Sequence, residues 1–213
     1  MEIEAQVVEV IDEAPDIKRF ILHLAQGIAP KHGQFVMLRF PDADYYRSYS
    51  IVAYDAKENL LTLYIKLHKK FTTRLFAGEQ TLMLKGPFGR FLLEVQHPSV
   101  FIAAGIGITP IYNLASSAKK PADLFYVARS YEEMALNEEI DSLPEHIKVY
   151  RFVSRVPHEG CTFRHLEIDD ILQIKDAKDR RFYLCGPETF MDMMTEGLMA
   201  HGIPAEHIFR EAF

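Results

Sequence analysis

Apolar and polar residues alternate with a period of two through much of the first half of the chain. Between residues 17 and 24, the apolar Phe20, Leu22 and Leu24 stand at alternate positions, set against the polar Lys18, Arg19 and His23. This is the pattern of a half-buried β-strand. The same pattern predicts strands over residues 3–11, 34–40, 45–52, 60–67, 81–84 and 91–95. Residues 71–76 are predicted to form a short helix instead. Short strands separated by glycine and proline turns predict an antiparallel β-barrel with Greek-key connections.

The pattern changes after His97 and Pro98, where predicted strands begin to alternate with predicted helices. The strands cover residues 100–104, 123–128, 147–152, 181–184 and 208–210; one helix starts at Thr109, and others cover residues 132–143, 165–171 and 187–201. Repeated strand–helix units predict a Rossmann-like parallel sheet with helices on both faces. The sequence therefore predicts two domains, at residues 1–97 and 98–213.

The first strand of this second domain runs into a turn that is suited to binding an anion. A continuous apolar run, typical of a strand buried on both faces, leads into Gly105, Gly107, Ile108, Thr109 and Pro110. We expect Thr109 to cap the helix and Pro110 to occupy its first turn. Free N–H groups at a helix start attract phosphate. The alternative is a purely structural turn, because Pro110 replaces the third glycine of the dinucleotide fingerprint.

Composition narrows the class of protein. The chain has 213 residues and a formal net charge of −6, which argues against a nucleic-acid surface. Its two cysteines, Cys161 and Cys185, are far apart, so we expect neither a disulfide framework nor an iron–sulfur centre. No apolar run approaches membrane-spanning length, so we expect no membrane insertion and a cytoplasmic location. His158, Cys161 and His165 lack a fourth ligand, so no metal site is predicted.

One polar strand of the barrel carries an unusual set of side chains. Arg47, Ser48, Tyr49 and Ser50 place a cation, an aromatic ring and two hydroxyls on consecutive residues. An arginine fork suits phosphate, and a tyrosine ring can lie flat on a conjugated ring system. Taken alone, these residues are also typical of a solvent-facing sheet surface.

Five motifs in order resemble those of the ferredoxin–NADP reductase family. They are Arg47–Ser48–Tyr49–Ser50, Gly86–Pro87–Phe88–Gly89, Gly105–Ile106–Gly107–Ile108–Thr109–Pro110, Cys185–Gly186–Pro187 and Glu211–Ala212–Phe213. The resemblance spans nearly the whole chain. It implies a β-barrel that holds a flavin, usually FAD, and a Rossmann-like domain that delivers NAD(P)H.

The resemblance implies roles for residues of the barrel. Arg47 would bind the flavin phosphate, Tyr49 would stack on the isoalloxazine ring, and Ser50 would hydrogen-bond near the flavin N5. Ser48, on the other side of Tyr49, belongs to the same cofactor-binding motif. Ile65 and Lys66 resemble the next flavin-lining strand. Relatives often have a glycine pair before a Ser or Thr that holds the diphosphate, whereas here Lys69 and Lys70 precede Thr72 and Thr73. The hydroxyls remain candidates, but the missing glycines leave FMN open beside FAD.

The resemblance also implies a coenzyme site in the second domain. Gly105, Gly107, Ile108, Thr109 and Pro110 match the pyrophosphate loop. Arg129 and Ser130 end the second strand, where an NAD-preferring fold would more usually place an acid. Ser154 and Arg155 resemble a pair that grips the 2′-phosphate of NADPH. These residues favour NADPH, with NADH left open; alternatively, the two arginines are surface residues at strand ends.

Residues near the end of the chain complete the expected active site. Cys185, with Gly186 and Pro187, resembles the segment that lines the nicotinamide site, although a lone cysteine is often a small buried residue. Glu211 would place a carboxylate in the active site, and Phe213 would stack on the flavin. The sequence thus predicts an NAD(P)H-dependent flavoprotein reductase with an external acceptor: ferredoxin, flavodoxin, a partner oxygenase subunit, free flavin or ferric chelates. The alternatives are a reductase that uses free flavin as substrate and a non-catalytic electron-transfer subunit.

Overall fold

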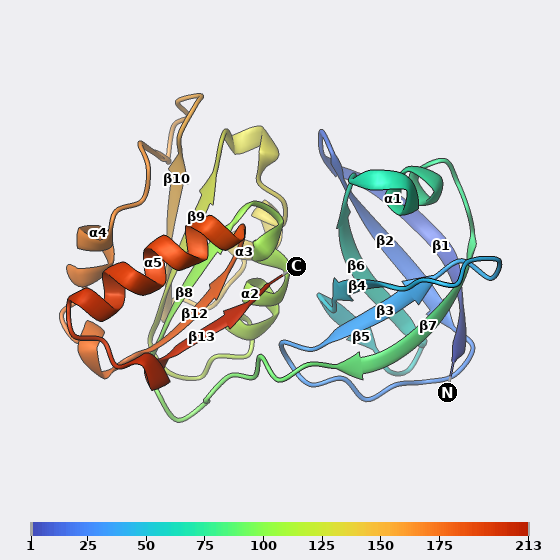
Figure 1. The fold of residues 1–213 in the computed structure, drawn as a ribbon, viewed down its shortest axis with the longest axis horizontal. Helices are drawn as coiled ribbons and strands as arrows, with labels where there is room; N and C mark the ends of the chain where they lie inside the picture. The colour runs from blue at the N-terminus through green and yellow to red at the C-terminus, as the bar shows by residue number, and fades with distance from the viewer. Residues whose placement is uncertain (1, 213) are drawn as a thin grey trace. The chain divides into compact units, whose positions relative to one another are not determined.

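The computed structural model describes residues 2–212 (Figure 1). The chain divides into two compact units, Met1–Leu92 and Leu93–Phe213. The change of domain after residue 97, inferred from the sequence pattern, stays a prediction.

The first unit contains one antiparallel sheet in the order β4-β3-β7-β1-β2-β6-β5. Its elements are β1 (Ile3–Ala14), β2 (Ile17–Leu24), β3 (Phe35–Arg39), β4 (Arg47–Ser50), β5 (Ala53–Asp55), β6 (Leu60–Lys66), α1 (Lys69–Phe76) and β7 (Thr81–Phe88). The chain crosses over β2 and β1 between β6 and β7, which is a Greek-key connection.

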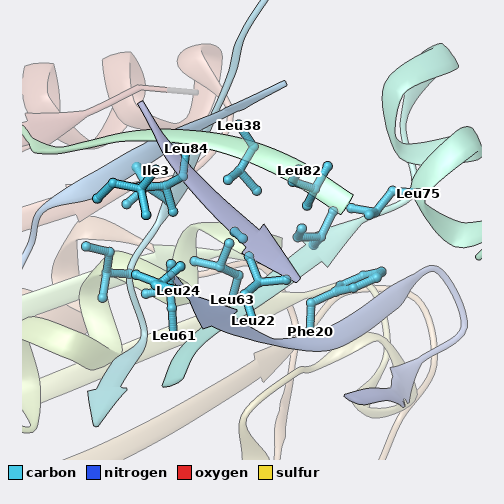
Figure 2. Close-up of a cluster of buried hydrophobic side chains, with 14 of the residues drawn as sticks. Ile3, Phe20, Leu22, Leu24, Leu38, Leu61, Leu63, Leu75, Leu82 and Leu84 are labelled. Carbon is cyan, nitrogen blue, oxygen red and sulfur yellow. The ribbon is translucent and has the colours of Figure 1, made fainter. Parts of the chain in front are cut away.

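The sheet closes because its two edge strands are almost consecutive in the chain. Only Ile51 and Val52 separate β4 from β5. The Val52 N–H donates to the Thr62 carbonyl of β6 at 3.1 Å, and the Ile51 N–H donates to the Gln34 carbonyl at 3.0 Å. Closure turns one face of every strand inward. Figure 2 shows the resulting core, in which Leu22, Leu61, Leu63, Leu82 and Leu84 are fully buried. The predicted antiparallel barrel is confirmed.

The second unit contains a parallel sheet in the order β11-β10-β9-β8-β12-β13. Its elements are β8 (Ser99–Ala104), α2 (Ile108–Ala115), β9 (Ala122–Ala128), α3 (Asn137–Asp141), β10 (Ile147–Val153), β11 (Thr162–Phe163), α4 (Ile168–Leu172), β12 (Arg181–Cys185), α5 (Glu188–Ala200) and β13 (Ile208–Glu211). Val100 and Ile102 of β8 pack with Met194 of α5, whereas Phe101 and Ala103, on the opposite face, are also fully buried. The apolar run is therefore a strand covered on both sides, and the predicted Rossmann-like fold is confirmed.

Two predicted elements are wrong. Residues 91–95 form no strand, because the backbone turns there: the His97 N–H donates to the Glu94 carbonyl, and the Glu94 N–H donates to the Tyr183 hydroxyl. The helix predicted over residues 132–143 is interrupted at Leu136, whose φ of 62° is left-handed. The Ala135 N–H donates instead to the buried Tyr126 hydroxyl at 3.0 Å. Only the five residues of α3 are α-helical there.

Candidate functional sites

The polar strand β4 lies at the edge of the barrel sheet and presents its side chains to different surroundings. Arg47 and Ser48 are exposed, Tyr49 is half-buried and Ser50 is buried. The Arg47 guanidinium lies over the Tyr45 ring, 4.8 Å from its centroid, and donates to the Tyr46 carbonyl at 3.0 Å. Burial raises the pKa of the Tyr49 hydroxyl, so this side chain stays protonated and uncharged across the physiological pH range. A cation and a neutral aromatic ring therefore stand two residues apart.

Phe71 of α1 joins this strand to the helix. Its ring centroid lies 4.5 Å from that of Phe40, 5.9 Å from that of Tyr49 and 6.4 Å from that of Tyr45. Aromatic pairs at these separations each stabilise by roughly 0.5–1.5 kcal/mol beyond their buried area. The cluster fixes the position of Tyr49. The sequence analysis missed Phe71 and Tyr45, because their contacts join segments that are distant in the chain.

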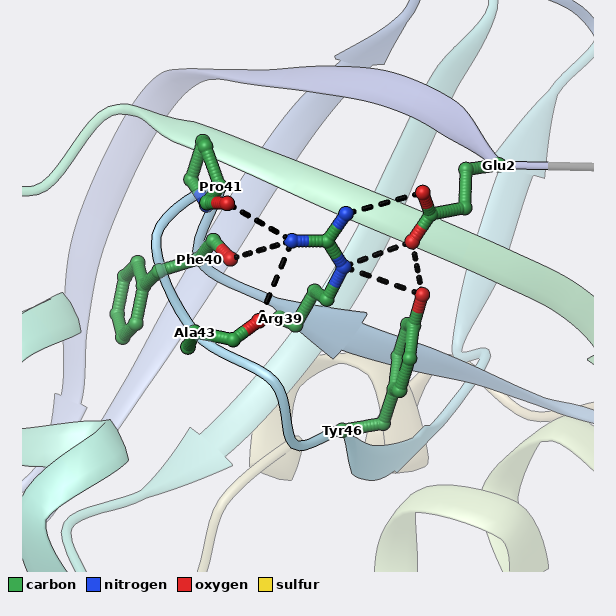
Figure 3. Close-up of polar contacts among 6 residues, drawn as sticks. All are labelled: Glu2, Arg39, Phe40, Pro41, Ala43 and Tyr46. Carbon is green, nitrogen blue, oxygen red and sulfur yellow. Dashed lines mark hydrogen bonds and ion pairs between the residues drawn. The ribbon is translucent and has the colours of Figure 1, made fainter.

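Arg39 organises the turn that leads into β4 (Figure 3). Its guanidinium binds the Glu2 carboxylate through two nitrogens, at 2.7 and 3.0 Å, and Tyr46 donates its hydroxyl to the same carboxylate. A third guanidinium nitrogen donates to three carbonyls of the turn, those of Phe40, Pro41 and Ala43. Charge-assisted bonds of this kind hold backbone firmly. The turn between β3 and β4 is thereby tied to the start of the chain.

The candidate diphosphate residues of α1 have local partners. The Thr72 hydroxyl donates to the His68 carbonyl at 2.5 Å, and the Thr73 hydroxyl donates to the Lys69 carbonyl at 3.0 Å. A phosphate role for either hydroxyl would need these bonds to exchange, and it stays a prediction. Lys69 has a φ of 63°, a conformation that favours glycine. A lysine thus adopts the left-handed backbone at one of the two positions where relatives often have glycine.

The next candidate flavin strand is β6. Ile65 is buried in the barrel core, whereas Lys66, at the end of the strand, pairs with Asp16 at 3.1 Å. Within the described residues, therefore, Lys66 does not offer an unpaired cation.

The glycine turn after β8 packs tightly against the turn after β12. A Cβ added to Gly107 would lie 2.3 Å from the Cys185 carbonyl oxygen, and one added to Gly186 would lie 2.8 Å from the Ala104 Cβ. Gly105 differs, because its φ is 56° and an added Cβ would meet open space. The two turns approach this closely only because side chains are absent at Gly107 and Gly186.

The start of α2 differs in detail from the expectation. Gly107 occupies the N-cap position, and no side chain caps the helix. The Thr109 hydroxyl donates to the Ile106 carbonyl at 3.0 Å, so the predicted cap at Thr109 is wrong. The reason is that a 3-10 turn over Gly105–Gly107 begins the helical path before Thr109. Pro110 does lie in the first turn of α2, as predicted.

Cys185 and Glu211 are paired residues of neighbouring parallel strands, β12 and β13. The Cys185 thiol donates to the Glu211 carbonyl oxygen at 3.1 Å. Burial raises the pKa of Cys185 and also raises that of Glu211. Burial therefore disfavours the thiolate, which is the nucleophilic form of Cys185, and the Glu211 carboxyl holds its proton more readily than an exposed one. Phe213, the other terminal candidate, lies outside the described residues.

The candidate residues for coenzyme choice meet where β9 and β10 end. The Arg155 N–H donates to the Arg129 carbonyl at 2.8 Å, and the Ser154 N–H donates to the Ala128 carbonyl at 3.2 Å. The Arg129 guanidinium pairs with Glu133 at 2.7 Å. The sequence analysis missed this partner, although the spacing of four residues is a recognisable signal.

Comparison with known proteins matches two family models to the chain. An oxidoreductase FAD-binding domain matches residues 4–93, and an oxidoreductase NAD-binding domain matches residues 101–196. The chain belongs to the ferredoxin–NADP reductase family. The resemblance inferred from the five motifs is thus confirmed, with FAD and a nicotinamide coenzyme as the expected cofactors.

Several known proteins are similar to this chain over most of its length. The reductase component of propane 2-monooxygenase from Mycolicibacterium smegmatis is 28% identical over 86% of this chain and 59% of its own. The stachydrine N-demethylase reductase subunit Stc4 of Rhizobium meliloti is 30% identical over 94% of this chain and 64% of its own. The crystal structure of the Amycolatopsis cytochrome P450 reductase GcoB has a TM-score of 0.87 and 23% identity, over 100% of this chain and 70% of that one. The chain spans about three fifths of the length of the first curated relatives it matches.

The residues of this family member fit its two cofactors. An exposed guanidinium beside a half-buried aromatic ring, as at Arg47 and Tyr49, suits a phosphorylated ring system. The open space at Gly105 leaves room for a ligand to approach the backbone. Among residues 2–212, no helix is both long and apolar enough to cross a membrane.

Proposed function

We propose that the chain is an NAD(P)H-dependent flavoprotein reductase that passes electrons to an external acceptor, an oxygenase-type partner protein or a ferredoxin or flavodoxin. The observation that carries this proposal is the presence of an FAD-binding and an NAD-binding domain in one chain. The names of relatives support it: they are reductase or electron transfer components of propane 2-monooxygenase and anthranilate 1,2-dioxygenase.

The barrel residues bind and orient the flavin in this proposal. Arg47 neutralises its phosphate, and Tyr49, held by Phe71, presents a neutral ring for stacking. Ser50, with Ser48 beside it on β4, offers a hydroxyl to the reactive part of the ring. Ile65 and Lys66 of β6 remain candidates for the next flavin-lining strand, with the Ile65 side chain in the core and Lys66 paired with Asp16. When bound, a flavin takes up two electrons from a nicotinamide and releases them singly or in pairs.

The second unit positions the nicotinamide coenzyme in this proposal. The turn from Gly105 to Pro110 receives its pyrophosphate, because N–H groups at a helix start favour an anion. Cys185 forms an uncharged wall, since its thiol stays protonated, and Gly186 and Pro187 continue that wall. Glu211, paired with Cys185 across the two strands, would hold a proton more readily than an exposed carboxyl, because burial raises its pKa. The 2′-phosphate of NADPH would be held by residues at the ends of β9 and β10, namely Arg129, Ser130, Ser154 and Arg155.

A second candidate function is reduction of free flavin. It is favoured by α1, where Lys69 and Lys70 replace glycine and the hydroxyls of Thr72 and Thr73 already bond to local backbone. A weak hold on the diphosphate would let the flavin leave. The variant Lys69→Gly, Lys70→Gly restores the glycine pair and should tighten FAD binding if this reasoning holds.

The cytoplasmic location expected from the sequence stays a prediction.

The experiment that tests the proposal is purification followed by an acceptor panel with NADH and NADPH in parallel. A yellow protein that oxidises NAD(P)H steadily only with a protein acceptor supports the principal proposal. Equal rates with free FAD or FMN as acceptor, and a colourless purified chain, favour free-flavin reduction. A yellow protein that oxidises neither coenzyme would overturn both and indicate a non-catalytic electron-transfer subunit.

A further inference from the structure

A cavity of about 530 Å³ lies in the second unit, on one face of the parallel sheet. Its lining includes Asp123 and Phe125 of β9 and Lys148, Tyr150 and Phe152 of β10. These are alternate positions of each strand, so all five side chains share one face. The short helix α4 contributes Asp170 to the lining. Tyr150 is 39% exposed.

One wall of this cavity is aromatic. The rings of Phe125 and Tyr150 stack with centroids 4.8 Å apart and planes inclined by 13°, and Phe152 lies 6.4 Å from Phe125. The Arg164 guanidinium lies over Phe152, 5.4 Å from the ring centroid. Phe125 and Phe152 are buried and support this wall from the core, so the exposed ring of Tyr150 is the flat surface that a planar, conjugated ligand can meet.

The rest of the lining carries an excess of positive charge. Arg180, which is 7% exposed, pairs with Asp123 at 2.6 Å and with Asp176 at 2.8 Å, and Arg164 pairs with Asp170. These pairs leave one carboxylate in excess, and the Tyr150 hydroxyl donates to Asp123 at 3.0 Å. Lys148 and Lys175 also line the cavity, and neither forms an ion pair within residues 2–212. Their two ammonium groups outweigh that carboxylate, so the lining keeps a net positive charge for an anionic ligand.

We propose that this cavity binds a small planar aromatic anion, with its ring against Tyr150 and its charge beside Lys148 and Lys175. The site is distinct from the candidate coenzyme residues. Neither the Gly105–Pro110 turn nor Arg129, Ser130, Ser154 and Arg155 line it. Asp123 and Lys148 lie at the starts of their strands, whereas Arg129 and Ser154 follow the strand ends. The proposal goes beyond the reductase activity and does not depend on it.

The test uses the FAD-loaded chain and two fluorescent probes of similar shape, anilinonaphthalenesulfonate, an anion, and N-phenylnaphthylamine, which is neutral. We expect saturable binding of the anion at one site. The double variant Lys148→Gln, Lys175→Gln should weaken it roughly tenfold, the effect of losing charge-assisted contacts. The matched control Lys119→Gln, Lys120→Gln changes two exposed lysines outside the lining and should leave affinity unchanged. The neutral probe should respond to neither variant.

Three results would overturn the proposal. The first is no saturable binding of the anion, and the second is equal loss of affinity in the two double variants. The third is displacement of the anion by saturating NADH or NADPH, which would locate it at the coenzyme residues. Backbone amide shifts in nuclear magnetic resonance spectra provide an independent readout. They should change on adding the anion at residues 148–152 and 173–176, and shifts confined to other segments would likewise contradict the proposal.

Discussion

Gly107 and Cys185 are in direct backbone contact: a Cβ at residue 107 would lie 2.3 Å from the carbonyl oxygen of residue 185. The glycine belongs to the turn after β8, and the cysteine ends β12. The contact locks the candidate pyrophosphate turn to the segment that carries Cys185, Gly186 and Pro187. Because Gly107 has no side chain, the two backbones can pack this closely. The packing fixes the position of the candidate pyrophosphate turn relative to the candidate nicotinamide segment within the second unit.

Gly107→Ala should therefore destabilise the second unit. Backbone atoms at 2.3 Å cannot move aside as a flexible side chain would, and overpacking of this kind costs about 1–3 kcal/mol. Thermal unfolding should show a Tm lower by roughly 2–4 °C for each kcal/mol lost. The matched control is Gly105→Asn, because asparagine tolerates left-handed backbone and an added Cβ meets open space there. Equal melting of the two variants would contradict the packing argument.

Arg47→Ala should weaken flavin binding. The variant removes a charge-assisted contact to phosphate, which is worth roughly 1.5–3 kcal/mol, or tenfold or more in Kd. Flavin content after gel filtration and Kd from fluorescence titration measure the effect. Lys57→Ala, in the exposed turn between β5 and β6, is the control and should keep its flavin. Full occupancy in the purified Arg47→Ala protein would show that Arg47 does not bind the phosphate.

Glu2 should make the stability of the barrel depend on pH. Hydrogen bonds from Arg39 and Tyr46 lower the pKa of its carboxyl from 4.5 to about 2. Because the folded-state pKa is lowered, the contribution to stability is complete above about pH 4.5 and is lost as the pH falls toward about 2. The Tm difference between the wild type and Glu2→Gln should shrink over that interval. Glu58→Gln is the control, and a difference that stays constant with pH would argue against the ion pair.

Coenzyme choice should depend more on Arg155 than on Arg129. Arg129 is already paired with Glu133, whereas Arg155 lies exposed beside it. Arg155→Ala should raise the KM for NADPH roughly tenfold and change that for NADH little. Glu133→Gln should release Arg129 and lower the KM for NADPH only a few-fold, because exposed pairs are weak, about 0–1 kcal/mol. Steady-state kinetics with both coenzymes measure these changes in KM. An equal rise of the KM for NADPH and for NADH in Arg155→Ala would refute a role of Arg155 in binding the 2′-phosphate.

Much of the fold was predictable because local patterns dictate it. The apolar run from Val100 to Ala103 and the alternation of Phe20, Leu22 and Leu24 correctly indicated strands buried on two faces and on one. Other features depend on distant contacts. The strand β5 exists because it pairs with β6, and the helix expected from residue 132 breaks because Tyr126 accepts the Ala135 N–H. No local pattern contains that information.

The candidate site residues also fall into two groups, those that local sequence motifs indicate and those that depend on distant contacts. The motifs singled out Arg47, Tyr49 and Gly107 from local sequence, and the cofactor roles of these residues stay predictions. They did not find Phe71 or Arg39, whose partners lie far away in the chain or across a turn. Lys69 is the clearest case: its left-handed φ is a glycine-like conformation without a glycine to signal it.

Anaerobic mixing of the flavin-loaded chain with NADH or NADPH tests the central claim most directly. The account predicts that the visible absorbance of the bound flavin bleaches on adding one equivalent of coenzyme, and that colour returns on adding an oxidised protein acceptor. Slower bleaching in Arg155→Ala with NADPH, but not with NADH, would tie the reaction to the coenzyme residues. A flavin that remains oxidised under excess of both coenzymes would contradict the account.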